Sequence, residues 1–442
     1  MEKQNFKDKI KGSITIKIIS ILIMILLLMI PNFMVSDLIR ERSSRKTEIE
    51  KEIGKSYGRH QKIMAPILRI PYLKEYKDSN NRLTSSTGII SISPQQTTID
   101  GRIQTDTRKR SIYEIVIYNS QLDINTSFDL KQAQFNQILD WEDYSFDLSR
   151  AYFIVGISDP NGLSENSQIK MGDNVLPFTD NENINLQNMA WIKSDIVDIT
   201  EKQDFSIQCK LDFKGTRSLM IEPIGEQVIV NLESQWIDPS FIGQQLPDNY
   251  DITEAGFKSK WVVNRFAHSY PKYWLNDAAN FVNKNYSFGV KLIQPIDEYG
   301  KNKRTAKYAL LIISLTFGIF FFFEILLKKN IHPIQYTLIG FALTLFYLLL
   351  LSITEHLGFD LAYIISSAAT ITLIISYTKF ILESVKGTAI LSALMIFLFG
   401  YIFVILQMQD FALVMGAIAL FLVLATVMML SRKVNWYQIG KS

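Results

Sequence analysis

The sequence from Ala306 to Thr354 reads AKYALLIISLTFGIFFFFEILLKKNIHPIQYTLIGFALTLFYLLLLSIT. Two mainly apolar runs of about 20 residues stand on either side of a short polar turn, and this is the length that a helix needs to cross a bilayer. Neither run has the alternation of a barrel strand, so only a helix can satisfy its backbone polar groups in lipid. The stretch therefore predicts two membrane helices joined by a tight turn.

Other parts of the chain have the same apolar character. Together, the runs predict six transmembrane helices at residues 14–35, 306–327, 334–354, 361–381, 388–406 and 411–430. The first run follows a lysine-rich start, as a signal peptide would, but it ends at Pro31-Asn32-Phe33-Met34 without a small-residue cleavage pattern. We therefore expect a retained anchor rather than a cleaved leader.

The long polar segment between the first and second helices has a different pattern. Apolar residues alternate with polar ones in three series, which begin at Leu122, Phe205 and Val228. Period-two alternation between clusters of Gly, Pro, Asn and Asp is typical of antiparallel strands with one buried face. The segment is long enough for about ten strands, and it therefore predicts an all-β, sandwich-like domain inserted between helix 1 and helix 2. The single cysteine, Cys209, lies in one series, so we interpret it as a small buried hydrophobe.

Basic residues indicate how the chain is oriented. Lys and Arg gather at the N-terminus, near Lys328, at Lys386 and at the C-terminus, while the short loops on the other side hold the acids Glu355, Asp360 and Asp410 and no Lys or Arg. By the positive-inside rule, this predicts a multi-pass inner-membrane protein with both termini in the cytoplasm. The predicted parts are a cytoplasmic tail with helix 1 (1–35), a charged stalk helix (36–60), an extracytoplasmic β-rich domain (61–305), a five-helix bundle (306–430) and a cytoplasmic tail (431–442).

Composition and motifs exclude several classes of function. A formal net charge of +3 over 442 residues gives no basic surface for nucleic acid. The four histidines fall in no zinc-binding pattern, and the chain has neither a Walker loop nor a Gly-x-Ser-x-Gly nucleophile motif. We therefore predict no catalytic residues, no cofactor and no metal, and a protein that is not an enzyme. The lipid bilayer is the one certain partner.

Polar residues within the apolar runs are the candidate functional groups. Glu324 interrupts a phenylalanine-rich run, and a carboxylate in lipid is costly unless it is paired, protonated or in contact with water. Lys328, one turn later, and Lys379, at a similar depth in another helix, are its candidate partners. His332 stands in the inner turn before Pro333, which suits the first turn of a helix.

A second candidate group lies in the predicted outer turn. Glu355 and His356 stand close to Asp360, so the histidine could sense pH or bind a cation. Short turns between membrane helices also carry such residues without further function. For both groups we favour a structural role over proton transfer or ligand binding.

Several segments resemble the CreD family of bacterial inner-membrane proteins. The resemblance rests on Tyr308 to Glu324, on Ile331-His332-Pro333-Ile334-Gln335-Tyr336, and on Phe346 to Ser352 with Glu355-His356. Ala65 to Pro71, Trp236 to Gly243, Glu254-Ala255-Gly256-Phe257 and Val434 to Tyr437 also match. The resemblance covers nearly the whole chain and is loosest over residues 75–200.

The resemblance implies a role in cell-envelope integrity and envelope stress, with no established reaction or cofactor. Three hypotheses follow. The first is a non-enzymatic protein that binds a periplasmic protein or envelope polymer. The second is a transporter or proton-linked relay centred on Glu324 and Lys379. The third is an enzyme that acts on lipid or peptidoglycan, for which we expect a deep pocket lined by acids or a histidine.

Overall fold

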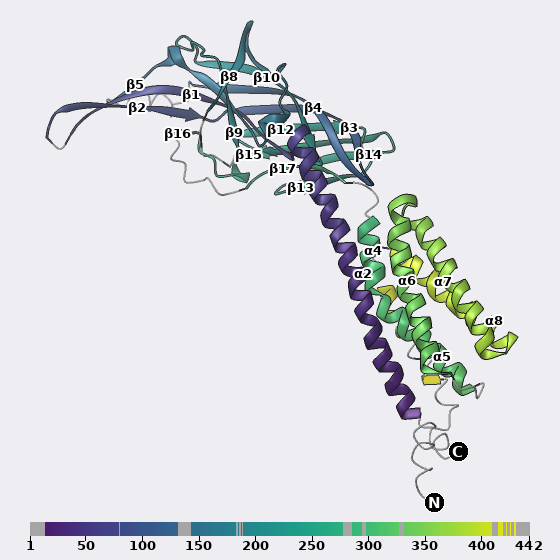
Figure 1. Cartoon of the computed structure of the whole chain (residues 1–442). Helices are drawn as coiled ribbons and strands as arrows, with labels where there is room; N and C mark the ends of the chain where they lie inside the picture. Colours follow the sequence, from purple (N-terminus) through teal and green to yellow (C-terminus); the bar gives the residue numbers. More distant parts are fainter. Residues whose placement is uncertain are drawn as a thin grey trace, which may run out of the picture. The chain divides into compact units, whose positions relative to one another are not determined.

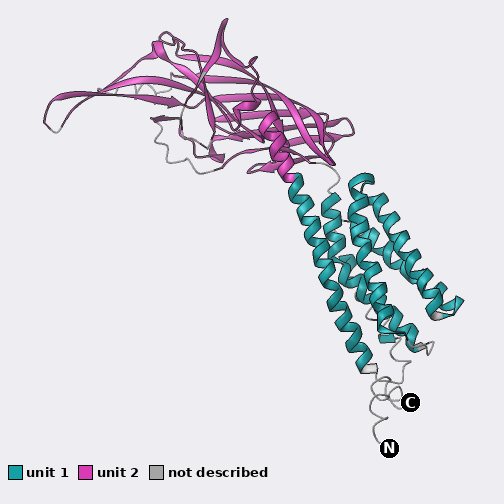
Figure 2. Cartoon of the chain, in the orientation of Figure 1, with its two compact units in different colours: residues 1–46, 296–442 teal, residues 47–295 magenta. Residues whose placement is uncertain are grey.

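The computed structural model describes residues 14–429 except 79, 131–142, 183, 185–186, 188, 277–284, 294–297, 327–330, 409–413, 419–420, 422–424 and 426–427 (Figure 1). The chain forms two compact units, one of residues 1–46 with 296–442 and one of residues 47–295 (Figure 2). We call them the helical unit and the β unit.

The helical unit is built from long apolar helices. They are α2 (Ile14–Tyr57), α5 (Ala309–Leu326), α6 (Pro333–Leu357), α7 (Phe359–Leu382) and α8 (Val385–Gln407), and a short polar helix, α4 (Glu298–Lys307), precedes α5. Of the described helices, α2, α6, α7 and α8 are each long and apolar enough to cross a membrane. Helices α4 and α5 are bent by 43° relative to each other, and if the pair counts as one span, the described helices include up to five spans. Several membrane helices are therefore confirmed. The predicted sixth, residues 411–430, lies largely outside the described residues.

Close packing between α2 and α6 depends on one glycine. A Cβ at Gly340 would collide with the side chain of Leu28 on α2, so the missing side chain lets the two helices approach, as small residues do in membrane bundles. Aromatic side chains also meet in the interior, where the Phe346 ring lies 5.5 Å from Tyr363 and 5.0 Å from Phe399 between ring centroids. These contacts join α6 to α7 and α8.

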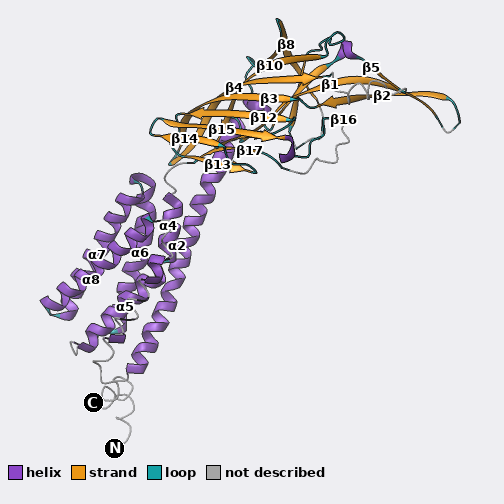
Figure 3. Cartoon of the chain, turned by 180° about the vertical axis from the view of Figure 1, so that it is seen from behind, coloured by secondary structure: helices purple, strands orange, loops and turns teal. Residues whose placement is uncertain are grey.

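The β unit consists mainly of strands (Figure 3). Its strands are β1 (Gln61–Lys77), β2 (Leu83–Ile92), β3 (Gln96–Arg110), β4 (Tyr113–Asp129), β5 (Tyr144–Phe146), β6 (Tyr152–Ile157), β7 (Gln168–Met171), β8 (Asn174–Glu182), β9 (Ala190–Ser194), β10 (Asp204–Thr216), β11 (Ser218–Glu222), β12 (Gln227–Ser234), β13 (Pro239–Gly243), β14 (Asn249–Thr253), β15 (Gly256–Asn264), β16 (Tyr273–Leu275) and β17 (Phe288–Leu292). Short 3₁₀ turns lie at Leu148–Arg150, Pro160–Gly162 and Arg265–Ala267.

The strands form two layers. In the first layer the order is β13-β17-β11-β1-β6-β9-β8, and β2, β16 and β5 extend it alongside β1. In the second layer the order is β14-β15-β12-β3-β4-β10-β7-β8. Strand β8 pairs in both layers and so joins them along one side. Among the described strands, β1 with β11 and β3 with β12 pair in parallel, and the other pairs are antiparallel.

One hydrophobic core lies between the two layers. Phe128 on β4 meets Phe153 on β6 at 5.7 Å, and Trp261 on β15 meets Phe288 on β17 at 5.5 Å, so ring contacts cross from one layer to the other. Cys209 on β10 is fully buried, as the alternation predicts. The predicted β-rich domain is confirmed. It holds more strands than the ten that the alternation suggested, because many of its strands have five residues or fewer and are too short to show a period.

Candidate functional site

Glu324, near the end of α5, sits in a buried polar site of the helical unit. Its side chain is 5% exposed. Its Oε1 accepts hydrogen bonds from Lys17 Nζ at 2.7 Å and from the Ile331 backbone N–H at 3.0 Å, and its Oε2 accepts one from the Tyr336 hydroxyl at 3.1 Å. The donors come from α2, from the turn after α5 and from the start of α6.

This arrangement gives the carboxylate the partners that burial requires. A buried charge is stable only when it is paired and its remaining lone pairs accept hydrogen bonds. Here one ammonium and two neutral donors meet those needs, so Glu324 ties three helical segments together. These contacts give Glu324 a structural role, in which its charge and hydrogen bonds hold the three segments together.

The structure shows a partner of Glu324 that the sequence prediction did not include. Lys328 lies outside the described residues, and Lys379 is exposed on α7. The cation in contact with Glu324 is Lys17, in the first turn of α2. Lys17 lies inside the first predicted apolar run, residues 14–35, and was assigned no role from the sequence. The depth of Lys17 in the membrane could have indicated this pairing. Lys17 and Glu324 each lie about one turn inside the predicted cytoplasmic end of a membrane helix.

His332 begins α6 as its N-cap. Its Nδ1 accepts a hydrogen bond from the Ile334 backbone N–H at 3.3 Å, and its own backbone N–H donates to Gln335 Oε1 at 2.9 Å. This reciprocal pair is a capping box, in which two otherwise unpaired backbone donors are satisfied. His332 therefore acts locally, by starting the helix that carries Tyr336 toward Glu324.

The other candidates lie at the far end of α6. Glu355, 13% exposed, is 3.5 Å from Arg42 Nε on α2, while His356 is exposed. With a rise of 1.5 Å per residue, Glu355 is roughly 35 Å along α6 from His332. The predicted residues thus occupy two ends of the helical unit and do not converge on one site.

A polar cluster that the sequence did not reveal lies near the start of α7. Lys301 Nζ on α4 is 3.2 Å from Asp360 Oδ1 and 3.1 Å from Gln407 Oε1, and Gln407 Nε2 donates to Asp360 at 2.7 Å. These three side chains join α4, α7 and α8. Asp360 is 57% exposed, so the cluster is solvated and contributes little to stability.

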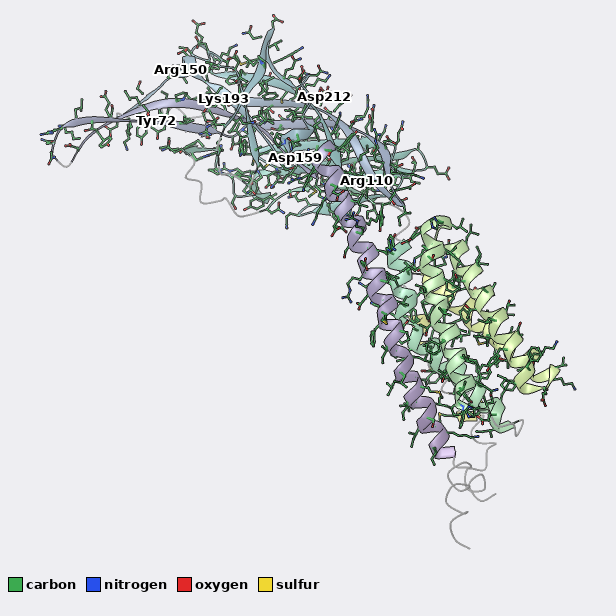
Figure 4. The ribbon with its side chains drawn as sticks, in the orientation of Figure 1. Tyr72, Arg110, Arg150, Asp159, Lys193 and Asp212 are labelled. Atoms are coloured by element: carbon green, nitrogen blue, oxygen red, sulfur yellow. The ribbon has the colours of Figure 1, made fainter. Side chains whose placement is uncertain are left out.

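In the β unit, the outward face of the second layer carries rows of polar side chains. Register aligns Asp212, Gln121, Arg102, Glu233, Lys258 and Asp251 across six neighbouring strands; Asp212 is labelled in Figure 4. The signs of the charged members alternate along this row. Arg102 Nε lies 2.9 Å from Glu233 Oε1. A second row places Asp100 directly opposite Asp123, two like charges at one position of the sheet.

These rows line an open groove of about 580 Å³. Its charged lining residues are the acids Asp100, Asp123, Glu233 and Asp251 and the bases Arg102, Lys258 and Lys260. A second hollow of about 300 Å³ shares part of this lining and continues toward the β14–β15 turn. The acids accept hydrogen bonds and the bases donate them, so the groove suits a polar ligand with hydroxyl, amine and carboxyl groups. The groove depends on register and sheet curvature, neither of which the sequence specifies.

A second buried carboxylate belongs to the β unit. Glu222 is fully buried; its Oε1 accepts from the Tyr270 hydroxyl at 2.8 Å and the Tyr286 backbone N–H at 3.1 Å, and Lys62 Nζ lies 3.6 Å from Oε2. Burial raises the pKa of the Glu222 carboxyl above its ordinary value. Burial also lowers the pKa of nearby His268, whose ring contacts Tyr270. The carboxylate links β1, β11 and the segments that hold the two tyrosines.

No group of three or more His, Cys, Asp or Glu side chains in the described part of the chain could hold a metal ion.

A family model and a similar protein both relate this chain to the same family. The family model described as inner membrane protein CreD matches residues 13–437, almost the whole chain. Inner membrane protein CreD of Escherichia coli (strain K12) is 28% identical over 440 residues, which cover 97% of this chain and 95% of the relative. The chain, a multi-pass membrane protein with a large β unit, therefore belongs to the CreD family of inner membrane proteins.

Proposed function

We propose that this protein supports the integrity of the cell envelope by holding an envelope polymer with its β unit, without catalysis. The observation that carries the proposal is the mixed-charge groove on the outward face of the second layer. The helical unit anchors the protein in the inner membrane. Six transmembrane helices, including residues 411–430, place the β unit outside the membrane and both termini in the cytoplasm.

The orientation is supported by the distribution of basic residues. Short segments on the proposed inner side carry Lys386 and the cationic ends of the chain, whereas Glu355 and Asp360 lie on the outer side. The basic residues of the long outer segment do not oppose this orientation, because long loops are translocated largely regardless of charge.

The groove points to a ligand that presents several polar groups at once. Carboxylates, amines and side-chain amides line it together, and the pairs they form with one another are exposed, so exchange for a ligand costs little. Peptidoglycan offers sugar hydroxyls together with the amines and carboxylates of its peptides. Its carboxylates can pair with the lysines and arginine of the lining, and its amines with the acids.

Sedimentation with purified peptidoglycan sacculi tests the proposal, using the full-length protein in detergent micelles. Reversing two basic groove residues, Lys258→Glu with Lys260→Glu, should reduce the bound fraction about tenfold. Lys170→Glu, on the same outward face but outside the groove, is the matched control and should bind as the wild type does. Failure of the wild-type protein to sediment with sacculi, or full binding by the double variant, contradicts the proposal.

A second candidate function, a transporter or proton-linked relay, is favoured by one observation: the buried Glu324 carboxylate touches both an ammonium and a phenol. Under this hypothesis, Glu324→Gln abolishes function in a deletion strain while the protein remains at normal abundance in the membrane. If Glu324 instead has only a structural role, any loss of function in the variant follows the loss of folded protein.

A further inference from the structure

The two sides of the sandwich in the β unit are built differently. On one side β8 pairs with β7 in one layer and with β9 in the other, so the layers are joined by hydrogen bonds. On the opposite side, β13 and β14 end the layers, and within the described residues each pairs with one strand only, β17 and β15 respectively. This side presents two sheet edges.

At the β14 edge the hydrophobic core is incompletely covered. Tyr250 and Ile252 are in register with Ser259 and Phe257 of β15, whose side chains are 5% and 2% exposed. Tyr250 and Ile252 are nevertheless 63% and 44% exposed. The Phe241 ring of β13, centred 5.4 Å from that of Tyr250, covers only part of this face. Two apolar side chains at alternate positions are thus available to a further layer of contacts.

The backbone of β14 is equally available. A two-residue loop, Glu254-Ala255, connects Thr253 to its partner Gly256, and in such a hairpin the closing pair exchanges hydrogen bonds. Residues of an antiparallel strand then alternate between bonding to the neighbour and pointing away from it. By this alternation, Tyr250 and Ile252 direct their N–H and C=O groups toward the outer edge.

Charge limits what can pair there. Residues 244–257 include Asp248, Asp251 and Glu254 and no Lys or Arg, and the nearest lysines, Lys258 and Lys260, lie on β15, on the side of β14 away from its open edge. Two copies of this chain paired through β14 would bring acids together, and like charges on paired strands are unfavourable. A strand with basic side chains would instead be attracted.

We propose that β14 accepts an extended segment of another protein by β-strand addition, with apolar side chains alternating with Lys or Arg. The main-chain ladder supplies affinity, the apolar side chains cover Tyr250 and Ile252, and the basic side chains face the acids of residues 244–257. This site adjoins the polymer groove, since Tyr250 and Asp251 of β14 line the groove, but Ile252 and Glu254 lie outside it.

Binding of synthetic peptides to the full-length protein in detergent micelles tests this inference. The probe is a fluorescent peptide of alternating valine and lysine, and the control is its isomer with all valines followed by all lysines. The alternating peptide should bind about tenfold more tightly than the block isomer. Ile252→Pro, which removes one outward N–H, should abolish the difference, whereas Ile252→Val should preserve it. Glu254→Lys should weaken binding several-fold.

Hydrogen exchange provides a readout that does not depend on a variant. On addition of the alternating peptide to the wild-type protein, the amides of Tyr250 and Ile252 should exchange more slowly, while that of Asp251 should change little. Equal binding of both peptides, or unchanged exchange at Tyr250 and Ile252, overturns the proposal. Protection that rises with protein concentration in the absence of peptide overturns the assignment of the partner and shows self-association instead.

Discussion

The strongest test of the helical unit is removal of the Glu324 carboxylate. Glu324→Ala deletes the acceptor for Lys17, the Ile331 backbone and Tyr336 at once. Hydrogen bonds to a charged group contribute about 1.5–3 kcal/mol each. Lys17 is 31% exposed, so solvent screens its share toward the small value of surface pairs. We therefore expect a loss of about 3–5 kcal/mol, mainly because the buried Ile331 N–H and Tyr336 hydroxyl lose their acceptor, at about 1–3 kcal/mol each.

The conservative variant separates charge from hydrogen bonding. Glu324→Gln keeps an oxygen that can accept from Ile331 or Tyr336 but removes the negative charge that faces Lys17. We expect it to cost about 1–2 kcal/mol, less than the alanine variant, because one acceptor is retained.

The assay must report on the helices alone. The six tryptophans are at positions 141, 191, 236, 261, 274 and 436, so none lies in α5 to α8 and five lie in the β unit. Thermal unfolding in detergent should therefore be followed by far-UV circular dichroism at the helical wavelength and, in parallel, by tryptophan fluorescence. For Glu324→Ala the helical midpoint should fall by about 10 °C, while the fluorescence midpoint stays near that of the wild type.

A matched control is Asp360→Asn. Asp360 is also paired with a lysine in the helical unit but is 57% exposed, so its replacement should cost less than about 1 kcal/mol. Our reading of Glu324 is refuted if its alanine variant unfolds at the same temperature as Asp360→Asn, or if both optical signals shift together.

Four further results are expected. Since burial raises the pKa of Glu222, the folded protein holds this proton more readily than the unfolded chain, so wild type should lose thermal stability relative to Glu222→Gln as pH rises above the ordinary carboxyl value of 4.5; a pH-independent difference between the two midpoints would contradict this. Burial raises the pKa of the Cys209 thiol, so maleimide should label the protein only on unfolding, as mass spectrometry of a denaturant series would show. His332→Ala should destabilise α6 by about 1 kcal/mol while His332→Asn, which can also cap, costs less, as measured by helical circular dichroism. Gly340→Val should lower the helical midpoint by clashing with α2, whereas Gly318→Val, at a position with open space beside its Cα, should not.

Much of the architecture follows from patterns that act locally. Length and apolarity identify the membrane helices, since lipid leaves the backbone no partner outside the helix. Alternation identifies the long strands β4, β10 and β12, because one face of each is buried. The three-residue strands β5 and β16 could not be predicted, since their pairing is imposed by the long neighbours β1 and β2.

The sites were harder to predict because they join distant parts of the chain. Glu324 could be selected as a costly charge, but its partner Lys17 lies 307 residues away, and helical spacing favoured the nearer lysines. His332 was selected by its place in the family motif, whereas the structure gives it a capping role. The groove needs five strands in register, which no local pattern encodes.

The parallel pairing of β1 with β11 has a consequence for how the protein is made. Gln61–Lys77 leaves the ribosome long before Ser218–Glu222, and β11 in turn needs β17, which ends at Leu292. Pairings this distant in sequence are slow to form. During synthesis, an unpaired and largely apolar β1 therefore waits for most of the β unit to emerge, and a chaperone or translocation channel that shields it in that interval should set the yield of folded protein.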